Sequence, residues 1–175
     1  MRGFLLDTNI PSEFSNPRPD PRVVQWVDSV PEDFVFISVV TLGELRKGCE
    51  LLDIGKRRYE LENWLEVEVR NWFAGRILPV TEAISERWGA LDAKRQRLGQ
   101  PLNIADGLIA ATALEHGFTV VTRNVSDFRE LGVAVFDPWG ERTPEAPLWP
   151  PAQEINPREF VEPDHQTCPQ RSKTG

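Results

Sequence analysis

Short runs of consecutive apolar residues alternate along this chain with longer amphipathic segments. The short runs lie at residues 4–6, 34–37, 77–78, 118–121 and 133–136. Continuous apolar runs are typical of strands in a sheet that is buried on both faces. In the longer segments, apolar residues recur every three or four positions, which predicts helices over 42–52, 83–98 and 103–116. The alternation therefore predicts an α/β fold with a mainly parallel sheet and right-handed crossovers.

The composition changes near residue 140. Residues 140–175 hold seven of the 15 prolines, and the segment ends in polar residues. Proline lacks a backbone donor and disfavours the interiors of helices and sheets. We expect one α/β domain over residues 1–139, followed by a proline-rich, extended or disordered tail over 140–175.

The charge balance and the few soft metal ligands narrow the functional classes. Lys and Arg number 20 against 27 Asp and Glu, a net charge of −7, which excludes a broadly basic nucleic-acid surface but not a nucleic-acid enzyme with a metal site. The two cysteines and two histidines lie too far apart for a zinc knuckle and give no disulfide framework. The longest apolar-rich run, 104–114, is too short to span a membrane, and Asp7 precedes any secretory apolar region. We expect a cytoplasmic protein.

Acidic and amide side chains cluster where predicted strands end and the next helices begin. These residues are Asp7, Glu44, Asp106, Asn124 and Asp127. In an open parallel sheet, the carboxyl ends of the strands and the starts of the following helices share one edge, where ligands bind. We therefore expect these side chains to converge on one site, although they come from four distant segments.

Carboxylates that share a site raise each other's pKa unless a cation lies among them. A hard divalent cation with oxygen ligands, Mg²⁺ or Mn²⁺, fits such a site, and the scarcity of His and Cys agrees because softer ions would use those ligands. Such an ion activates a water for attack on phosphorus. The chemistry predicted is metal-assisted hydrolysis of a phosphodiester.

Each acid also has a purely structural interpretation. Glu44 completes a capping box that begins at Thr41, and Asp106 is an acid in the first turn of a helix, where the helix dipole favours it. The remaining residues fall at ordinary turn positions. Only their common position at one predicted edge favours the functional interpretation.

At these residues the sequence resembles the PIN-domain ribonucleases, specifically the VapC-type toxins of bacterial toxin–antitoxin pairs, including the FitB-like branch. The matching segments follow the family's order and spacing and lie at 5–10, 38–46, 73–79, 105–113, 122–128 and 136–139. The resemblance covers residues 1 to about 139 and implies a PIN-like α/β/α sandwich. It also implies an endoribonuclease that depends on Mg²⁺, with Mn²⁺ as the alternative ion.

The resemblance also implies roles for individual residues. Asp7, Glu44 and Asp106 are the expected catalytic residues and metal ligands. The family's fourth acidic position falls on Asn124, whose amide cannot neutralise a second cation, so Asp127 is the alternative source of that charge. Residues expected to orient these groups or to contact phosphate are Thr8, Asn9, Ser38, Arg123 and Asp127, with Arg46 and Lys47 as further phosphate contacts. For Ser38 the structural alternative is a cap at the end of a strand.

The family implies partners as well: an RNA substrate, a homodimer, and a cognate antitoxin that forms a higher-order complex with the toxin on DNA. A basic residue of the antitoxin would be attracted to the acidic site. Candidates for the groove that holds the antitoxin are Phe14, Trp26, Trp64, Leu65, Trp72 and Phe73, although most of the tryptophans are expected in the core.

Two alternatives stay open from the sequence. A phosphatase of the haloacid-dehalogenase type also begins with an aspartate after its first strand, but its general acid two residues later would fall here on Asn9. A catalytically weakened PIN-domain protein would act mainly as an antitoxin-binding partner in operator autoregulation. The missing acid at Asn9 and the lack of a matching lysine disfavour the phosphatase, and the presence of Asp7, Glu44 and Asp106 favours an active enzyme over the weakened protein.

Overall fold

The sheet is parallel throughout. The computed structural model describes residues 3–140, so the predicted tail lies outside the described residues beyond Gly140. The five strands run in the order β3-β2-β1-β4-β5, and every neighbouring pair is parallel. The strands are β1 (Phe4–Leu6), β2 (Val35–Ser38), β3 (Ile77–Leu78), β4 (Thr119–Val121) and β5 (Ala134–Phe136). The predicted α/β class and parallel sheet are confirmed.

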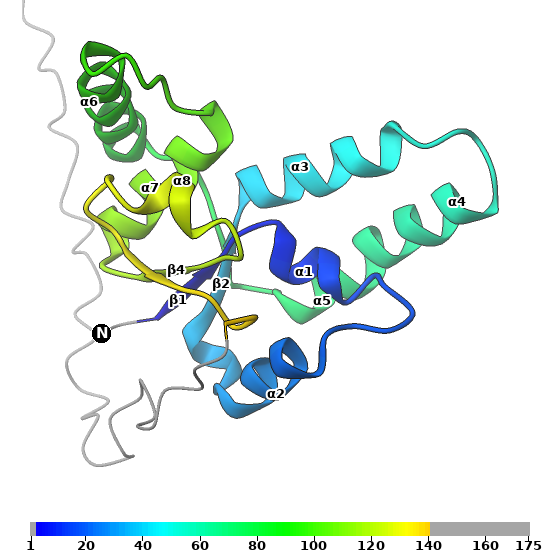
Figure 1. Cartoon of the computed structure of the whole chain (residues 1–175). Helices are drawn as coiled ribbons and strands as arrows, with labels where there is room; N and C mark the ends of the chain where they lie inside the picture. The colour runs from blue at the N-terminus through cyan, green and yellow to red at the C-terminus, as the bar shows by residue number, and fades with distance from the viewer. Residues whose placement is uncertain (1–2, 141–175) are drawn as a thin grey trace, which may run out of the picture. The chain divides into compact units, whose positions relative to one another are not determined.

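Helices connect every pair of successive strands (Figure 1). Between β1 and β3 lie α1 (Asn9–Glu13), α2 (Pro21–Ser29), the 3₁₀ turn η1 (Glu32–Phe34), α3 (Val39–Glu50), α4 (Lys56–Asn63), the π-helical segment η2 (Trp64–Val69) and α5 (Arg70–Trp72). The remaining helices are α6 (Glu82–Arg97), α7 (Ile104–His116) and α8 (Val125–Phe128). Within residues 3–140, no helix is both long and apolar enough to cross a membrane.

Two separate apolar cores cover the two faces of the sheet. On one face, Phe4 and Leu6 of β1 pack with residues of α2, α3 and η2. On the other face, Leu5 of β1 packs with Ile109 and Ala110 of α7 and with Phe128 of α8. Consecutive residues of β1 therefore face opposite cores, which explains why the strand has no polar position and gives the three-layer α/β/α arrangement.

The order of the strands identifies the switch point of the sheet. From β1 the chain adds β2 and then β3 on one side, and afterwards adds β4 and β5 on the other side. Strands β1 and β4 are neighbours, with Leu6 opposite Val121 at their carboxyl ends. These two ends therefore flank the position where the direction of winding reverses. In open α/β sheets, a ligand crevice forms outside the strands at this position.

Local capping chemistry sets the starts of the helices that border this crevice. Helix α7 begins after Asn103, whose side chain accepts a hydrogen bond from Ala105 N, and ends at Gly117 in the left-handed conformation (φ 65°), as predicted. Helix α3 begins three residues earlier than the predicted pattern, because Ser38 and not Thr41 caps it. Glu44 therefore lies in the second turn of α3, and its interpretation as a capping-box residue is wrong.

Candidate active site

Asp7 is the most constrained carboxylate of the site. It follows β1 directly, is only 4% exposed, and its backbone N–H extends the pairing with β4 by donating to Val121 O at 3.0 Å. Its Oδ1 accepts a hydrogen bond from Thr8 N at 2.7 Å. Its Oδ2 accepts from Asn9 Nδ2 and from Thr122 Oγ1, each at 2.7 Å. Donors from two strand ends therefore fix the orientation of this carboxylate.

Burial raises the pKa of Asp7 above its ordinary value. The hydrogen bonds from Thr122 and Thr8 act in the opposite direction and lower the pKa, while the negative charges of Glu44 and Asp127 raise it further. The net effect is a carboxyl group that resists ionisation unless a positive charge approaches it.

Thr8 connects Asp7 to Glu44. Its backbone N–H donates to Asp7, and its hydroxyl donates to Oε2 of Glu44, which lies 36 positions further along the chain. This bond brings the second turn of α3 to the end of β1. Asp7 and Glu44 therefore both accept hydrogen bonds from Thr8.

Asp106 enters the same site from the third position of α7. Its pKa is raised to about 6, first by burial and then by the negative charges of Asp7, Asp127 and Glu44. No cation of the described chain is among the causes acting on Asp106 or Asp7. The negative charges of Glu44 and Asp127 therefore act on both Asp7 and Asp106, although the four residues come from separate segments.

Asn124, the predicted fourth position, contributes no charge and lies exposed at the N-cap of α8. Its backbone N–H donates to Thr122 Oγ1 at 2.9 Å, so the turn it occupies helps to hold the hydroxyl that contacts Asp7. Asp127, one turn further on, is the residue whose negative charge reaches Asp7 and Asp106.

The donor set suits a hard divalent cation, since it consists of carboxylate, hydroxyl and amide oxygens without His or Cys. Within residues 3–140, no three His, Cys, Asp or Glu side chains converge closely enough to form a closed set of metal ligands. The close three-carboxylate grip expected from the sequence is therefore not present in this arrangement. Magnesium keeps several waters and binds through one or two carboxylates, so an open set of this kind fits it.

Ser38 does not take the orienting role expected for it. Its hydroxyl accepts a hydrogen bond from Thr41 N at 3.1 Å and so caps α3. Thr41 in turn donates through Oγ1 to Leu6 O at 3.3 Å, which fixes the start of α3 against the end of β1. Ser38 supports the site through the backbone, and the structural alternative for it is confirmed.

Sequence reasoning missed Thr122, which is fully buried and makes three hydrogen bonds. Its hydroxyl donates to Asp7 and accepts from Asn9 Nδ2 and Asn124 N, both at 2.9 Å. The signal in the sequence is its position: Thr122 follows β4 directly, as Asp7 follows β1.

Gly107, the residue after Asp106, also has a role that the sequence did not reveal. A Cβ at this position would lie 2.7 Å from Cδ1 and 2.9 Å from Nε1 of Trp88 on α6. Only a glycine lets the indole approach the first turn of α7 this closely. The contact therefore sets where α7 begins relative to α6, and so where Asp106 lies.

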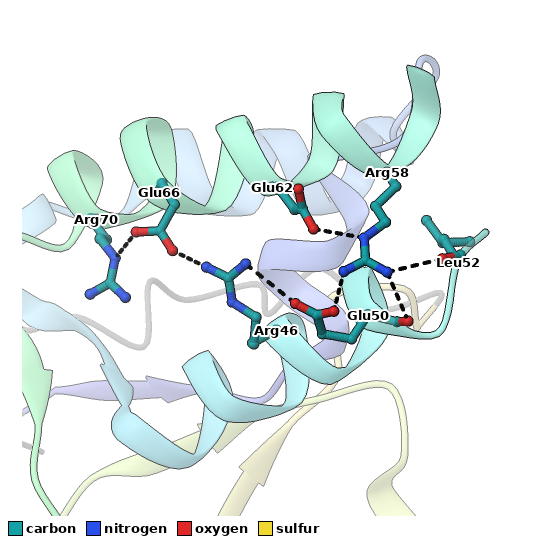
Figure 2. Close-up of polar contacts among 7 residues, drawn as sticks. All are labelled: Arg46, Glu50, Leu52, Arg58, Glu62, Glu66 and Arg70. Carbon is teal, nitrogen blue, oxygen red and sulfur yellow. Dashed lines mark hydrogen bonds and ion pairs between the residues drawn. The ribbon is translucent and has the colours of Figure 1, made fainter. Parts of the chain in front are cut away.

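The basic residues predicted to contact phosphate differ in whether they form ion pairs within the protein. Arg46 forms ion pairs with Glu66 of η2 and Glu50 of α3, within a network that joins α3 to the following helices (Figure 2). In the same network Arg58 pairs with Glu50 and Glu62. Arg46 is therefore committed to a structural contact. Arg123 makes no ion pair within the described part of the chain.

A groove of about 560 Å³ lies between the α1–α2 region and η2. Its apolar lining is Phe14, Val27, Val30, Trp64, Val69 and Trp72, and its acidic lining is Asp28, Glu32 and Glu68. Three of the six residues expected in a groove, Phe14, Trp64 and Trp72, therefore line one. The other three do not: Leu65 and Phe73 are buried, and Trp26 packs edge-on against Phe4 in the core.

Known proteins match most of this chain in sequence and in fold. A family model of the PIN domain matches residues 4–133. Over 136 residues the chain is 43% identical to Toxin FitB of Neisseria gonorrhoeae, covering 78% of this chain and 98% of the relative. Over 136 residues it is 40% identical to VapC ribonuclease Y4jK of Sinorhizobium fredii, covering 78% of this chain and 97% of the relative.

Solved structures give the same result. The crystal structure of FitAcB from Neisseria gonorrhoeae matches with a TM-score of 0.72 and 43% identity, over 78% of this chain and 98% of that chain. The structure of FitAB bound to an IR36 DNA fragment matches with a TM-score of 0.73 and 40% identity, over 79% of this chain and 97% of that chain.

The parallel sheet with carboxylates at its switch point is that of a PIN domain. The chain belongs to the PIN-domain family, among its VapC-type, FitB-like toxins, which confirms the resemblance seen in its sequence.

Proposed function

We propose that this protein is a Mg²⁺- or Mn²⁺-dependent endoribonuclease that acts as the toxin of a toxin–antitoxin pair. One observation carries the proposal: the negative charges of Glu44 and Asp127 act on both Asp7 and Asp106 at the sheet's switch point, with no cation of the described chain among the influences on Asp7 or Asp106. An uncompensated group of carboxylates at a ligand crevice favours a bound divalent cation. The relatives named as a VapC ribonuclease and as a tRNA(fMet)-specific endonuclease support RNA as the substrate.

The cation would bind among Asp7, Glu44 and Asp106, directly to one or two of these carboxylates and through its waters to the rest. When bound, a divalent cation would activate water and stabilise the negative charge that develops on the phosphodiester. The chain's own contribution is orientation, because Thr122, Asn9 and Thr8 fix both oxygens of Asp7 before any ligand arrives. Thr8 holds Glu44 beside it.

Asp127 supplies the fourth negative charge in this proposal. The position that the family fills with an acid holds the exposed, uncharged Asn124. Asp127 raises the pKa of both Asp7 and Asp106, which supports its assignment as the fourth charge. Asn124 keeps a supporting role through the hydrogen bond of its backbone to Thr122.

RNA cleavage by the purified full-length protein tests the enzyme proposal. Total RNA is incubated with and without Mn²⁺, and the cleaved ends are mapped. We expect metal-dependent cuts that Asp7→Asn and Asp106→Asn abolish while folding survives. Asp53→Asn, which alters an exposed aspartate between α3 and α4, is the matched control and should cut like the wild type. If Asp7→Asn and Asp106→Asn both still cut RNA, the assignment of the active site is wrong.

The groove lined by Phe14, Trp64 and Trp72 is the proposed binding site of the antitoxin. A segment with an apolar face and basic residues would cover Phe14, Trp64 and Trp72 and pair with the acids that line the groove, Asp28, Glu32 and Glu68. The related FitAB and FitAcB structures are consistent with such a partner. We expect Trp64→Ala to weaken capture of the co-expressed antitoxin and to leave metal-dependent RNA cleavage by the free protein unchanged. Light scattering tests the expected homodimer of this 19.9 kDa chain and its larger complex with antitoxin and operator DNA.

A further inference from the structure

Arg123 and Trp139 form a cation–π pair at the edge of the sheet that carries the acids. Arg123 lies just beyond β4, and Trp139 lies just beyond β5. The guanidinium carbon of Arg123 is 5.3 Å from the centroid of the Trp139 ring. The backbone N–H of Arg123 donates to Asn9 Oδ1 at 3.4 Å. Arg123 therefore follows Thr122 and contacts Asn9, the two residues whose side chains hold Oδ2 of Asp7.

The guanidinium of Arg123 has no carboxylate partner among the described residues. Its side chain is exposed, and among residues 3–140 no carboxylate lies within 4.0 Å of its guanidinium. It is also absent from the influences on the pKa of Asp7 and Asp106. The backbone of Arg123 therefore lies at the site while its guanidinium has no carboxylate partner, in contrast to Arg46, which is paired in the network of Figure 2.

Trp139 is a fixed surface for this arginine. Its backbone N–H donates to Asp137 Oδ1 at 2.8 Å, in a turn that Gly140 N continues by donating to Asp137 O at 3.3 Å. The indole is half-buried and packs against the core on the α2 side of the sheet. Contact with the face of such a ring limits the conformations of the arginine and does not use its N–H donors as a hydrogen bond to a carboxylate would.

We propose that Trp139 is a positioning residue that holds Arg123 as a phosphate clamp for the RNA backbone beside the active site. Two parallel N–H donors of a guanidinium match two oxygens of one phosphate, and prior ordering of the side chain reduces the entropy lost on binding. Arg123 offers a positive charge without a carboxylate partner at the sheet edge that also carries the acids. The inference rests on the ribonuclease function proposed above and names a part of the protein that would bind the substrate.

Steady-state cleavage of a short RNA that spans a mapped cut site tests this clamp in the full-length protein. We expect Arg123→Gln to raise KM about 10-fold with little change in kcat, as for loss of one charge-assisted contact. The slope of log(1/KM) against log salt should become shallower by about 0.7, the value for one phosphate of a single strand. Arg97→Gln, an exposed cation of α6 without an ion pair among the described residues, is the matched control and should leave both values unchanged.

A double-mutant cycle separates positioning from a structural role of Trp139. Trp139→Ala should raise KM several-fold when Arg123 is present and should have no further effect in Arg123→Gln, whereas Trp139→Phe should keep most of the affinity. Equal effects of Trp139→Ala in both backgrounds would overturn the positioning role. An unchanged KM in Arg123→Gln would overturn the clamp. This holds even if that variant weakens capture of the antitoxin, because Arg123 would then contact the antitoxin and not the RNA. A wild-type protein without metal-dependent cleavage would overturn the proposed function and this inference together.

Discussion

Thr122 Oγ1 donates a 2.7 Å hydrogen bond to Oδ2 of Asp7, a residue 115 positions earlier in the chain. The bond joins the ends of β4 and β1, the two strands that flank the switch point of the sheet. Because the same hydroxyl accepts from Asn9 and Asn124, three hydrogen bonds that join the segments after β1 and β4 meet at one oxygen atom. Such a shared centre makes the orientation of Asp7 depend on a residue that carries no charge.

Thr122→Val tests this dependence, since it keeps the shape of the side chain and removes the hydroxyl. Asp7 then loses a donor that lowers its pKa, so the pKa should rise further and the acidic limb of the cleavage profile should move to higher pH. We expect kcat/KM to fall about 10- to 100-fold, and the free energy of unfolding to fall by about 1–3 kcal/mol because buried polar groups lose their partner. Thr122→Ser is the control that restores the hydroxyl. Wild-type activity in the valine variant would show that the bond has no functional role.

Asp106 should make the stability of the metal-free protein depend on pH. Its pKa is about 6 in the folded protein and 3.8 in the reference state, so the folded state holds a proton that the unfolded state has already released. Its contribution to stability is therefore fully present below pH 3.8 and is lost as the pH rises to 6 and beyond. We expect Asp106→Asn to be more stable than the wild type by about 1–2 kcal/mol at pH 8 in EDTA, after reduction for solvent screening of a half-exposed group. Urea unfolding at a series of pH values measures this gap, which should close toward pH 4.

A divalent cation should remove this penalty in the wild type. We expect Mg²⁺ or Mn²⁺ to raise the Tm of the wild-type protein in a concentration-dependent way, because a ligand that binds only the folded state stabilises it. The increase should be larger at pH 7.5 than at pH 5, since protons compete for Asp106 at the lower pH. Asp106→Asn should lose most of the increase, and EDTA should reverse it. An equal increase in Tm for the wild type and this variant would place the cation elsewhere.

Much of this fold could be predicted from short-range chemistry. Apolar strands without alternation fit only a sheet covered on both faces, and Leu5 and Leu6 indeed face opposite cores. The bounds of α7 follow from Asn103 and Gly117, which act within a few residues of themselves. The expected meeting of Asp7 and Asp106 at one edge follows from the direction of parallel strands.

The parts that could not be predicted depend on contacts between distant residues. Ser38 and Thr41 can each cap a helix, and in the structure Ser38 is the N-cap of α3. The hydroxyl of Thr41 instead donates to Leu6 O, 35 positions away. The nearness of Asp127 to Asp106 depends on the path of the turn after β4, which the pattern of residue types does not encode. The role of Gly107 depends on a ring from α6 that no local rule places there.

Gly107→Ala should shift α7 and with it Asp106. The added methyl group would lie 2.7 Å from the ring of Trp88, a distance that requires one of the two helices to move. We expect a loss of about 1–3 kcal/mol in the free energy of unfolding, measured by urea titration, together with reduced cleavage. Gly89→Ala is the matched control, because it lies within α6 with no atom near the added methyl group, and it should stabilise the protein by about 0.5–1 kcal/mol.

The last prediction concerns which residue after β4 supplies the fourth charge. Asp127→Asn removes a negative charge that raises the pKa of Asp106, so that pKa should fall and the stability penalty at pH 8 should shrink. Metal-dependent cleavage should fall about 10-fold, because the site attracts the cation less strongly. Adding Asn124→Asp to this variant should restore part of the activity if a carboxylate at the family's usual position can take over the role. Cleavage assays over a series of Mg²⁺ concentrations measure both effects as shifts in the half-saturating concentration. If Asp127→Asn leaves that concentration unchanged, Asp127 lies outside the working site, and Asp7, Glu44 and Asp106 alone account for its charge.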